Sequence, residues 1–347
     1  MRRLSLLPPG AAGPRHSPLL PIGLAVLLLL ALCAAAPGQA QETRLLVVSG
    51  LSGEPRFAAD FESWTQQLRE TAGKAGVPAA NVATLSEQGT GAQQATRANV
   101  LAALRALGAR AGPDDEMMIV LFGHGSDTGG EARLNLTGPD LTARDLAAAL
   151  EGVHARRITI VNTASASGAF LKPLAGGNRI VITATKSGAE QNETMFPRFF
   201  VAGLTGAAAD TDKDGRVSLF EAFDYARQEV ERAYTSTRRL QTEHPLLEAD
   251  GDGVGSPAPT ARDGDGAAAT LAFLGTTSAG TGGAAAGASE ALRTLQAEKR
   301  RIEGALEELR KQKAQLPEAE YQQRLERLLL DLSRNGQAIR KLTGGTS

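Results

Sequence analysis

The sequence predicts an α/β protein whose mostly parallel sheet is flanked by helices on both faces. Three short runs, 116–122, 157–162 and 179–185, are largely apolar, which indicates buried strands rather than strands with one face in water. Segments with the apolar spacing of amphipathic helices lie between them, and this alternation is typical of a sheet covered by helices. Aromatic residues make up only 4% of the 347 residues, so we expect a core of Leu, Val, Ile and Ala.

The remaining elements complete this pattern. Two further short strands are expected in the first half of the domain. One helix ends at Gly112-Pro113, because glycine and proline both interrupt helices. The additional strands are 44–49 and 81–85, and the expected helices are 57–75, 95–111, 141–150, 196–204 and 219–234.

The first 40 residues have the features of an export signal. Arg2 and Arg3 precede an apolar run over 19–36, and small residues at 38–40 precede the expected cleavage point. A membrane anchor is the alternative, but the apolar run is short for a membrane-spanning helix. Cys33 weakly resembles the acceptor of a lipoprotein signal. We therefore predict export to the periplasm or the extracellular space, with no stable membrane span after removal of residues 1–40.

Cysteine usage and charge exclude several classes of function. Cys33 is the only cysteine, so cleavage after residue 40 leaves a chain without disulfides and without a thiol for catalysis. The formal net charge is −1, and no strongly basic stretch contains interleaved aromatic residues. Nucleic acid is therefore not expected as a partner.

The composition changes twice after residue 253. Residues 254–288 are rich in Gly, Ala, Ser, Thr and Pro, which predicts a flexible linker. Residues 289–343 carry Leu and Ile at heptad-like spacing, with Pro317 where a second helix begins. This pattern predicts a helical hairpin or short coiled coil. Such a hairpin can fold back on itself, or it can form an oligomer or hold a partner protein.

Residues 210–221 match the twelve-residue loop of EF-hand calcium sites. Carboxylates at alternate positions can surround one ion, and Gly215 permits the sharp turn between them. The predicted ligands are Asp210, Asp212, Asp214, the backbone carbonyl of Arg216, Ser218 and Glu221. We predict calcium as the cofactor, in a structural role because no pair of such loops is evident. A second acidic turn at Asp250 and Asp252 can also bind a metal ion, but it lacks a closing Glu, which favours a solvated turn.

Two predicted strands end in residues that suggest catalysis. The strand 116–122 is followed by Gly123-His124-Gly125, where glycines let a substrate backbone approach and the Gly125 N–H can stabilise an oxyanion. The strand 157–162 is followed by a small-residue segment that contains Ser165. Parallel sheets bind ligands at the carboxyl ends of their strands, and both segments lie at such ends.

These residues carry a resemblance to a known family. The His-Gly after one buried strand and the Ala164–Gly168 segment after the next resemble the catalytic motifs of caspase-like and legumain-type cysteine peptidases. The resemblance extends over residues 42–253, and the loop 210–221 and the segment 242–247 are similar to bacterial members. It implies a caspase-like fold with His124 as the catalytic histidine and Gly125 as the oxyanion donor. It places Ser165 where the family has its nucleophilic cysteine.

Three functions follow from this sequence. The first is an exported, catalytically silent caspase-like domain that binds a peptide or protein and is stabilised by calcium. The motivation is the Ser165 hydroxyl, which is a poor nucleophile without a base in close contact. The second is an active hydrolase that uses Ser165 with His124 as base. The third is an envelope scaffold that acts through residues 289–343.

Overall fold

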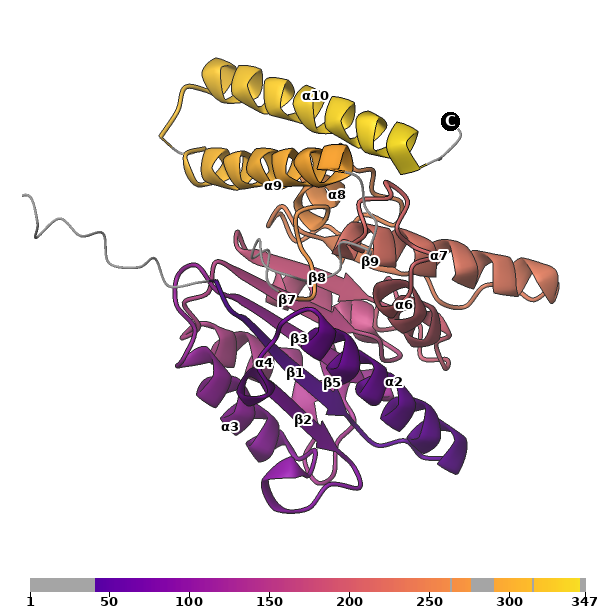
Figure 1. The fold of residues 1–347 in the computed structure, drawn as a ribbon. Coiled ribbons are helices and arrows are strands. Elements are labelled where there is room, and N and C mark those ends of the chain that lie inside the picture. Colours follow the sequence, from indigo (N-terminus) through magenta and orange to yellow (C-terminus); the bar gives the residue numbers. More distant parts are fainter. Residues whose placement is uncertain (1–40, 263, 276–289, 314, 344–347) are drawn as a thin grey trace, which may run out of the picture. The chain divides into compact units, whose positions relative to one another are not determined.

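A computed structural model describes residues 41–262, 264–275, 290–313 and 315–343. These described residues form one compact unit. Its centre is a six-stranded sheet in the order β2-β1-β3-β7-β8-β9 (Figure 1), in which five strands are parallel and β9 is antiparallel to β8. The prediction of an α/β fold with a mostly parallel sheet is therefore confirmed. The strands are β1 Thr43–Ser49, β2 Val82–Ser86, β3 Glu116–Phe122, β7 Arg157–Asn162, β8 Arg179–Thr183 and β9 Leu246–Glu248.

Helices bury both faces of this sheet. Alternate residues of β1 point into two different cores: Leu45 and Val47 into one, Leu46 and Val48 into the other. This is why the central strands are apolar at consecutive positions. The first core is closed by α2 Pro55–Lys74, α6 Phe196–Thr205 and α7 Leu219–Ser236. The second is closed by α3 Arg97–Gly108, α4 Ala143–Leu150 and α5 Leu171–Leu174.

A small antiparallel sheet follows β3. It consists of β4 Gly125–Thr128, β5 Glu131–Leu134 and β6 Leu141–Thr142, and sequence patterns did not predict it because its strands have only two to four residues. The next helix begins with a capping box, in which the Thr142 hydroxyl accepts from the Asp145 N–H and the Asp145 carboxylate accepts from the Thr142 N–H. Three single-turn helices complete the domain: η1 Ala79–Asn81, η2 Gly91–Gln93 and η3 Ser167–Phe170.

The predicted linker over 254–288 is wrong in its first part. Residues Gly264–Ala269 form α8, and Ala268, Ala269 and Ala272 are buried in the core beside α7. The Leu219 N–H donates to the Ala272 carbonyl at 2.8 Å. Small residues suit this position because they let α8 approach its neighbours closely. The Gly- and Ala-rich composition, which is typical of linkers, here allows close packing. The rest of the predicted linker, residues 276–288, and the predicted signal at 1–40 lie outside the described residues.

The C-terminal segment forms a hairpin of two helices, α9 Glu290–Lys311 and α10 Glu318–Thr343. Figure 1 shows them side by side above the α/β domain. Ile302 and Leu306 of α9 pack with Leu271 of the domain and with leucines of α10. Arg157 joins the two parts, because its guanidinium donates to Glu116 at 2.8 Å and to Glu307 of α9 at 2.6 Å. Among the helices that the structure describes, none combines the length and the apolar character that crossing a membrane requires.

Candidate functional site

The ends of β3 and β7 bring the predicted catalytic segments together. The two strands pair in parallel, with Leu121 opposite Asn162. The segments that follow them therefore leave the sheet at the same edge. Gly125 begins β4, and Ser165 lies just before η3. Hydrogen bonds between Gly125 and Ser165 join the two segments.

His124 is held by the loop and helix that follow β1. Its Nε2 lies 3.1 Å from the Ser52 carbonyl oxygen. Its ring meets the Phe57 ring edge-on, with 5.0 Å between centroids and an interplanar angle of 81°. The Phe61 ring lies 6.3 Å away. The imidazole is thus packed among aromatic rings and bonded to backbone.

Ser165 is bonded to the backbone of Gly125 in both directions. The Gly125 N–H donates to Ser165 Oγ at 3.0 Å, and the Ser165 hydroxyl donates to the Gly125 carbonyl at 3.1 Å. Ser165 is only 4% exposed. The segment is tight: a Cβ at position 125 would lie 2.3 Å from the Ser165 carbonyl oxygen, so only glycine fits there. The N–H that was predicted to bind an oxyanion is therefore engaged with the hydroxyl.

The predicted base and nucleophile do not form a dyad in this arrangement. No hydrogen bond between His124 and Ser165 is present, although both residues belong to the described part of the chain. A serine needs a base in close contact to become a nucleophile. Here its proton is directed at a backbone carbonyl. In this geometry the Ser165 hydroxyl is bonded to Gly125, and the His124 ring is bonded to the Ser52 carbonyl.

A second histidine, which the sequence did not single out as functional, supports the segment around Ser165. His244 Nδ1 lies 2.5 Å from Glu190 Oε1, and the His244 N–H donates to Glu190 Oε2 at 3.2 Å. The Glu190 carbonyl in turn accepts from the Ala166 N–H at 2.7 Å. Ala166 has a left-handed backbone with φ 55°. In the sequence, only the resemblance of residues 242–247 to bacterial family members drew attention to the segment that contains His244.

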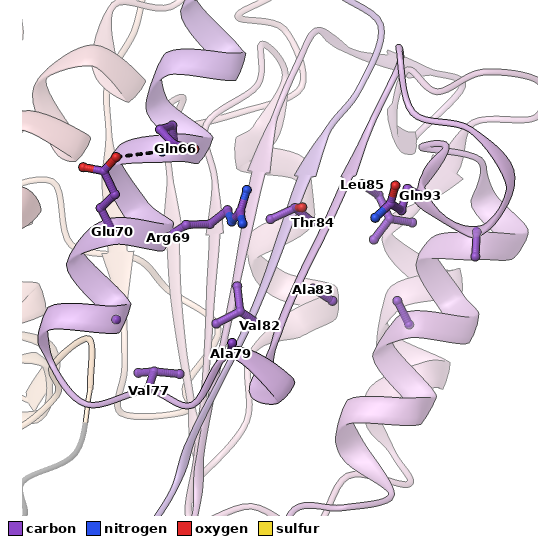
Figure 2. A pocket seen from close by; sticks show the side chains of 13 residues that line it. Gln66, Arg69, Glu70, Val77, Ala79, Val82, Ala83, Thr84, Leu85 and Gln93 are labelled. Carbon is purple, nitrogen blue, oxygen red and sulfur yellow. Dashed lines mark hydrogen bonds between the residues drawn. The ribbon is translucent and has the colours of Figure 1, made fainter.

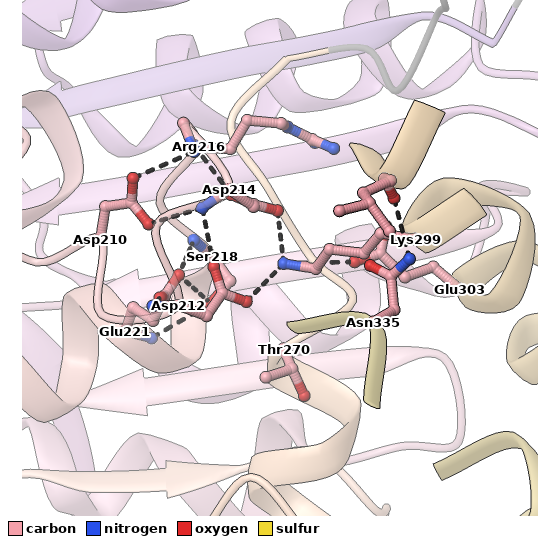
Figure 3. A network of polar contacts seen from close by, with 12 residues as sticks. Asp210, Asp212, Asp214, Arg216, Ser218, Glu221, Thr270, Lys299, Glu303 and Asn335 are labelled. Carbon is pink, nitrogen blue, oxygen red and sulfur yellow. Dashed lines mark hydrogen bonds and ion pairs between the residues drawn. The ribbon is translucent and has the colours of Figure 1, made fainter. Parts of the chain in front are cut away.

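The loop 210–221 brings three of its predicted ligands together. One carboxylate oxygen from each of Asp210, Asp212 and Asp214 lies within 4.8 Å of the other two (Figure 3). The loop N–H groups point inward: Asp214 N–H donates to Asp210 Oδ1 at 3.2 Å and to Asp212 Oδ1 at 3.1 Å. Gly215, with φ 86°, makes the turn, and its N–H donates to Asp210 Oδ2 at 3.0 Å. Burial, together with the neighbouring Asp214 carboxylate, raises the pKa of Asp210.

The other predicted ligands have different partners. Glu221 and Ser218 form the capping box of α7, in which the Ser218 N–H donates to Glu221 Oε2 at 2.9 Å. The second oxygen, Glu221 Oε1, accepts from the N–H and the hydroxyl of Thr211, both at 2.9 Å. Burial raises the pKa of Glu221, and the Asp212 carboxylate adds to the rise. The Arg216 guanidinium lies 3.5 Å from the centroid of the Phe273 ring.

A cation from α9 lies on the acidic loop. The Lys299 ammonium forms ion pairs with Asp212 Oδ2 and Asp214 Oδ2, and Glu303 Oε1 lies 3.9 Å from it (Figure 3). Burial lowers the pKa of Lys299, but the Asp214 and Asp212 carboxylates outweigh this and hold the pKa above its ordinary value. Burial raises the pKa of Glu303 to about 7. Sequence patterns could not reveal this contact, because Lys299 is one of many charged residues on α9.

One cavity lies away from the strand-end residues. It has a volume of about 520 Å³ and lies between α2 and the edge strand β2 (Figure 2). Arg69 and Glu70 of α2 border it on one side and Thr84 of β2 on the other. His124, Gly125 and Ser165 do not line it. A second cavity of about 470 Å³ between α8 and the hairpin is rich in basic side chains, namely Arg156, Arg157, Arg262, Arg310, Lys311 and Lys313.

Comparisons with known proteins give little further information. No family model matches the chain, and no curated protein matches it significantly. Among solved structures, the chain is similar to protein GSU0716 from Geobacter sulfurreducens, with a TM-score of 0.43 and 15% sequence identity. That match covers 68% of this chain and 99% of the other.

Proposed function

We propose that this chain is an exported caspase-like domain that no longer cleaves peptides and instead binds a peptide or protein segment. The observation that carries the proposal is the bonding of Ser165. Its hydroxyl both accepts from and donates to the backbone of Gly125, while the His124 ring contacts the Ser52 carbonyl. The resemblance to cysteine peptidases supports a caspase-like domain. Because the sequence has no cysteine beyond Cys33, the domain has no thiol nucleophile.

The cavity beside β2 is where we expect an extended peptide to bind. β2 is an edge strand of the main sheet, paired only with β1 on one side. On the other side, a single bridge between Ser86 and Gln94 is formed in the described part of the chain. An exposed edge can accept an added strand from a ligand through main-chain hydrogen bonds. The Arg69 and Glu70 side chains at the rim would select the ligand's charge.

The acidic loop fits calcium in its donor chemistry. Asp210, Asp212 and Asp214 offer oxygen ligands within a small volume, as hard cations such as calcium require. The Lys299 ammonium is bound to two of these carboxylates, which shows that the loop already holds positive charge. In this proposal the loop, with calcium bound, supports the start of α7 and thereby the sheet.

Peptidase activity is the direct test of catalytic silence. We expect residues 41–347 and the Ser165→Ala variant to give the same background cleavage of a peptide library, with and without calcium. We also expect no labelling of Ser165 by a fluorophosphonate probe. Cleavage that the Ser165→Ala substitution abolishes would show an active serine hydrolase and overturn the proposal.

Ligand binding is tested separately by selecting peptides from a display library on the same protein. We expect the selected peptides to lose affinity for an Arg69→Ala variant. Arg105→Ala is the matched control, because Arg105 is exposed on α3 and does not line the cavity. Equal affinity for both variants would place the binding surface elsewhere.

A further inference from the structure

A second group of carboxylates lies where β9 ends. Glu248 is the last residue of β9, and Asp250 and Asp252 follow it in a turn. One oxygen from each of the three lies within 4.8 Å of the other two. The turn is shaped by Gly251 and Gly253, whose φ angles are 89° and 76°. It is independent of the loop 210–221 in sequence and in its contacts.

Glu248 has a buried oxygen that lacks a hydrogen-bond donor. The residue is 0% exposed. Its Oε1 accepts from the Gly251 N–H at 2.6 Å, but no donor meets Oε2, although that atom is buried. A buried carboxylate oxygen without a donor or a positive partner is costly, and native structures rarely leave one so. A positively charged ligand beside this oxygen would remove that cost.

A fourth carboxylate comes from α8. Asp265 is buried, and its Oδ1 accepts from the Ala249 N–H at 2.7 Å and from the Asp250 N–H at 3.3 Å. These two hydrogen bonds hold the start of α8 against the turn, whereas the carboxylates that lie together are those of Glu248, Asp250 and Asp252.

The positive side chains nearby do not neutralise this group. Arg262 lines the same cavity as Asp250, but no ion pair between a basic side chain and any of the four carboxylates is formed within the described residues. In the loop 210–221, by contrast, Lys299 forms ion pairs with two aspartates. The carboxylates of Glu248, Asp250 and Asp252 therefore lie together without a protein cation among the described residues.

We propose that Glu248, Asp250 and Asp252 form a second divalent-cation site, suited to calcium. All three ligands are carboxylates, which hard cations prefer. Their irregular arrangement on a strand end and a turn suits calcium, whose coordination is flexible, better than magnesium, which demands a regular octahedron. Two of the ligands, Asp250 and Asp252, are exposed, so the ion has a path from solvent. The bound ion would fasten the turn to the end of β9.

Ion counting by native mass spectrometry of residues 41–347 in calcium tests the proposal. We expect the double variant Asp250→Asn/Asp252→Asn to bind one ion fewer than the wild type. Both side chains are exposed, so the variant should fold, and near-ultraviolet circular dichroism checks this. The matched control is Asp60→Asn/Glu62→Gln on exposed positions of α2, which should leave the count unchanged. An unchanged count in the first variant overturns the proposal.

Two further variants separate this site from the loop 210–221. The variant Asp212→Asn/Asp214→Asn should lose the ion of the loop 210–221. If its ion count does not fall, that result contradicts the proposed calcium loop and not this site. Glu248→Gln should weaken calcium binding to the remaining site about tenfold or more, as expected when a coordinating group is lost. Wild-type affinity in Glu248→Gln would mean that the buried oxygen does not bind the ion. It would contradict the assignment even if the turn binds calcium.

Discussion

The hydroxyl at position 165 has a structural role at the ends of two strands. It is bonded in both directions to Gly125 and is almost fully buried. It fastens the end of β7 to the start of β4. Under the proposed function this position carries a hydroxyl in place of a thiol, which would ionise readily near neutral pH.

Gly125→Ala should strongly destabilise the protein. Its Cβ would lie 2.3 Å from the Ser165 carbonyl oxygen and 2.9 Å from that of Arg133, and backbone atoms cannot move aside cheaply. We expect a loss of about 1–3 kcal/mol in the free energy of unfolding, as for other overpacked sites. Denaturant titration measures it. Gly152→Ala is the control, because nothing lies within 4 Å of a Cβ there; equal losses would refute the close approach.

Several elements meet at Glu243, a buried carboxyl near the start of β9. It accepts from the N–H groups of Met195 and Phe196 at 2.8 and 3.0 Å, and so caps α6. The Tyr234 hydroxyl of α7 donates to it at 3.3 Å. One side chain therefore joins the start of α6 to the end of α7, and its ionisation affects both helices.

Stability should fall with rising pH because of Glu243. Burial raises its pKa from 4.5 to about 7, although the N–H groups of Met195 and Phe196 oppose the rise. The folded state holds this proton more tightly than the unfolded chain, so the contribution is complete below about pH 4.5 and is lost as the pH rises through about 7. The loss is up to about 3 kcal/mol.

Urea denaturation at pH 5.5 and 8.5, in EDTA, measures this dependence. We expect the free energy of unfolding of Glu243→Gln to change less between the two pH values than that of the wild type. Asp265 and Glu303, whose burial raises their pKa to about 6 and about 7, remain in both proteins and act in the same direction. An identical pH dependence in the two proteins would contradict the role of Glu243.

The sequence predicts elements well where burial dominates and poorly where local contacts decide. The apolar runs at 116–122, 157–162 and 179–185 correspond to β3, β7 and β8 within two residues at either end. The composition around α8 predicts a linker incorrectly, because small residues are typical both of flexible chains and of close packing. At the candidate site, the sequence predicts the adjacency of His124 and Ser165. Their separate hydrogen bonds depend on side-chain directions that no spacing encodes.

At the scale of the whole molecule, charged side chains hold the hairpin on the α/β domain together with a small apolar contact. Arg157 pairs with Glu307, and Lys299 pairs with Asp212 and Asp214. The Lys299 pairs use the same carboxylates that calcium would bind. A carboxylate oxygen cannot contact both cations fully, so ion binding and hairpin docking should oppose each other, and each must weaken the other equally.

Lys299→Met should therefore raise the calcium affinity of the loop 210–221. We expect a gain of about tenfold, equal to about 1.4 kcal/mol, because the ion no longer displaces an ammonium. Isothermal titration calorimetry measures the affinity, and Lys311→Met is the control, since Lys311 pairs only with Glu308 on the surface of α9. In the wild type, calcium should also speed hydrogen exchange in α9. Unchanged affinity in Lys299→Met would show that the two cations do not compete.

The position of Lys299 in the chain gives this competition an order in time. Asp212 and Asp214 precede it by 87 and 85 residues, so they leave the ribosome, and any export channel, well before it. With the proposed calcium site, the ion would meet the carboxylates first in a compartment that contains calcium, and the hairpin would then reach a loop that already holds an ion. In a compartment without calcium, α9 would meet no competing ion. The same chain would thus finish folding differently according to where it emerges.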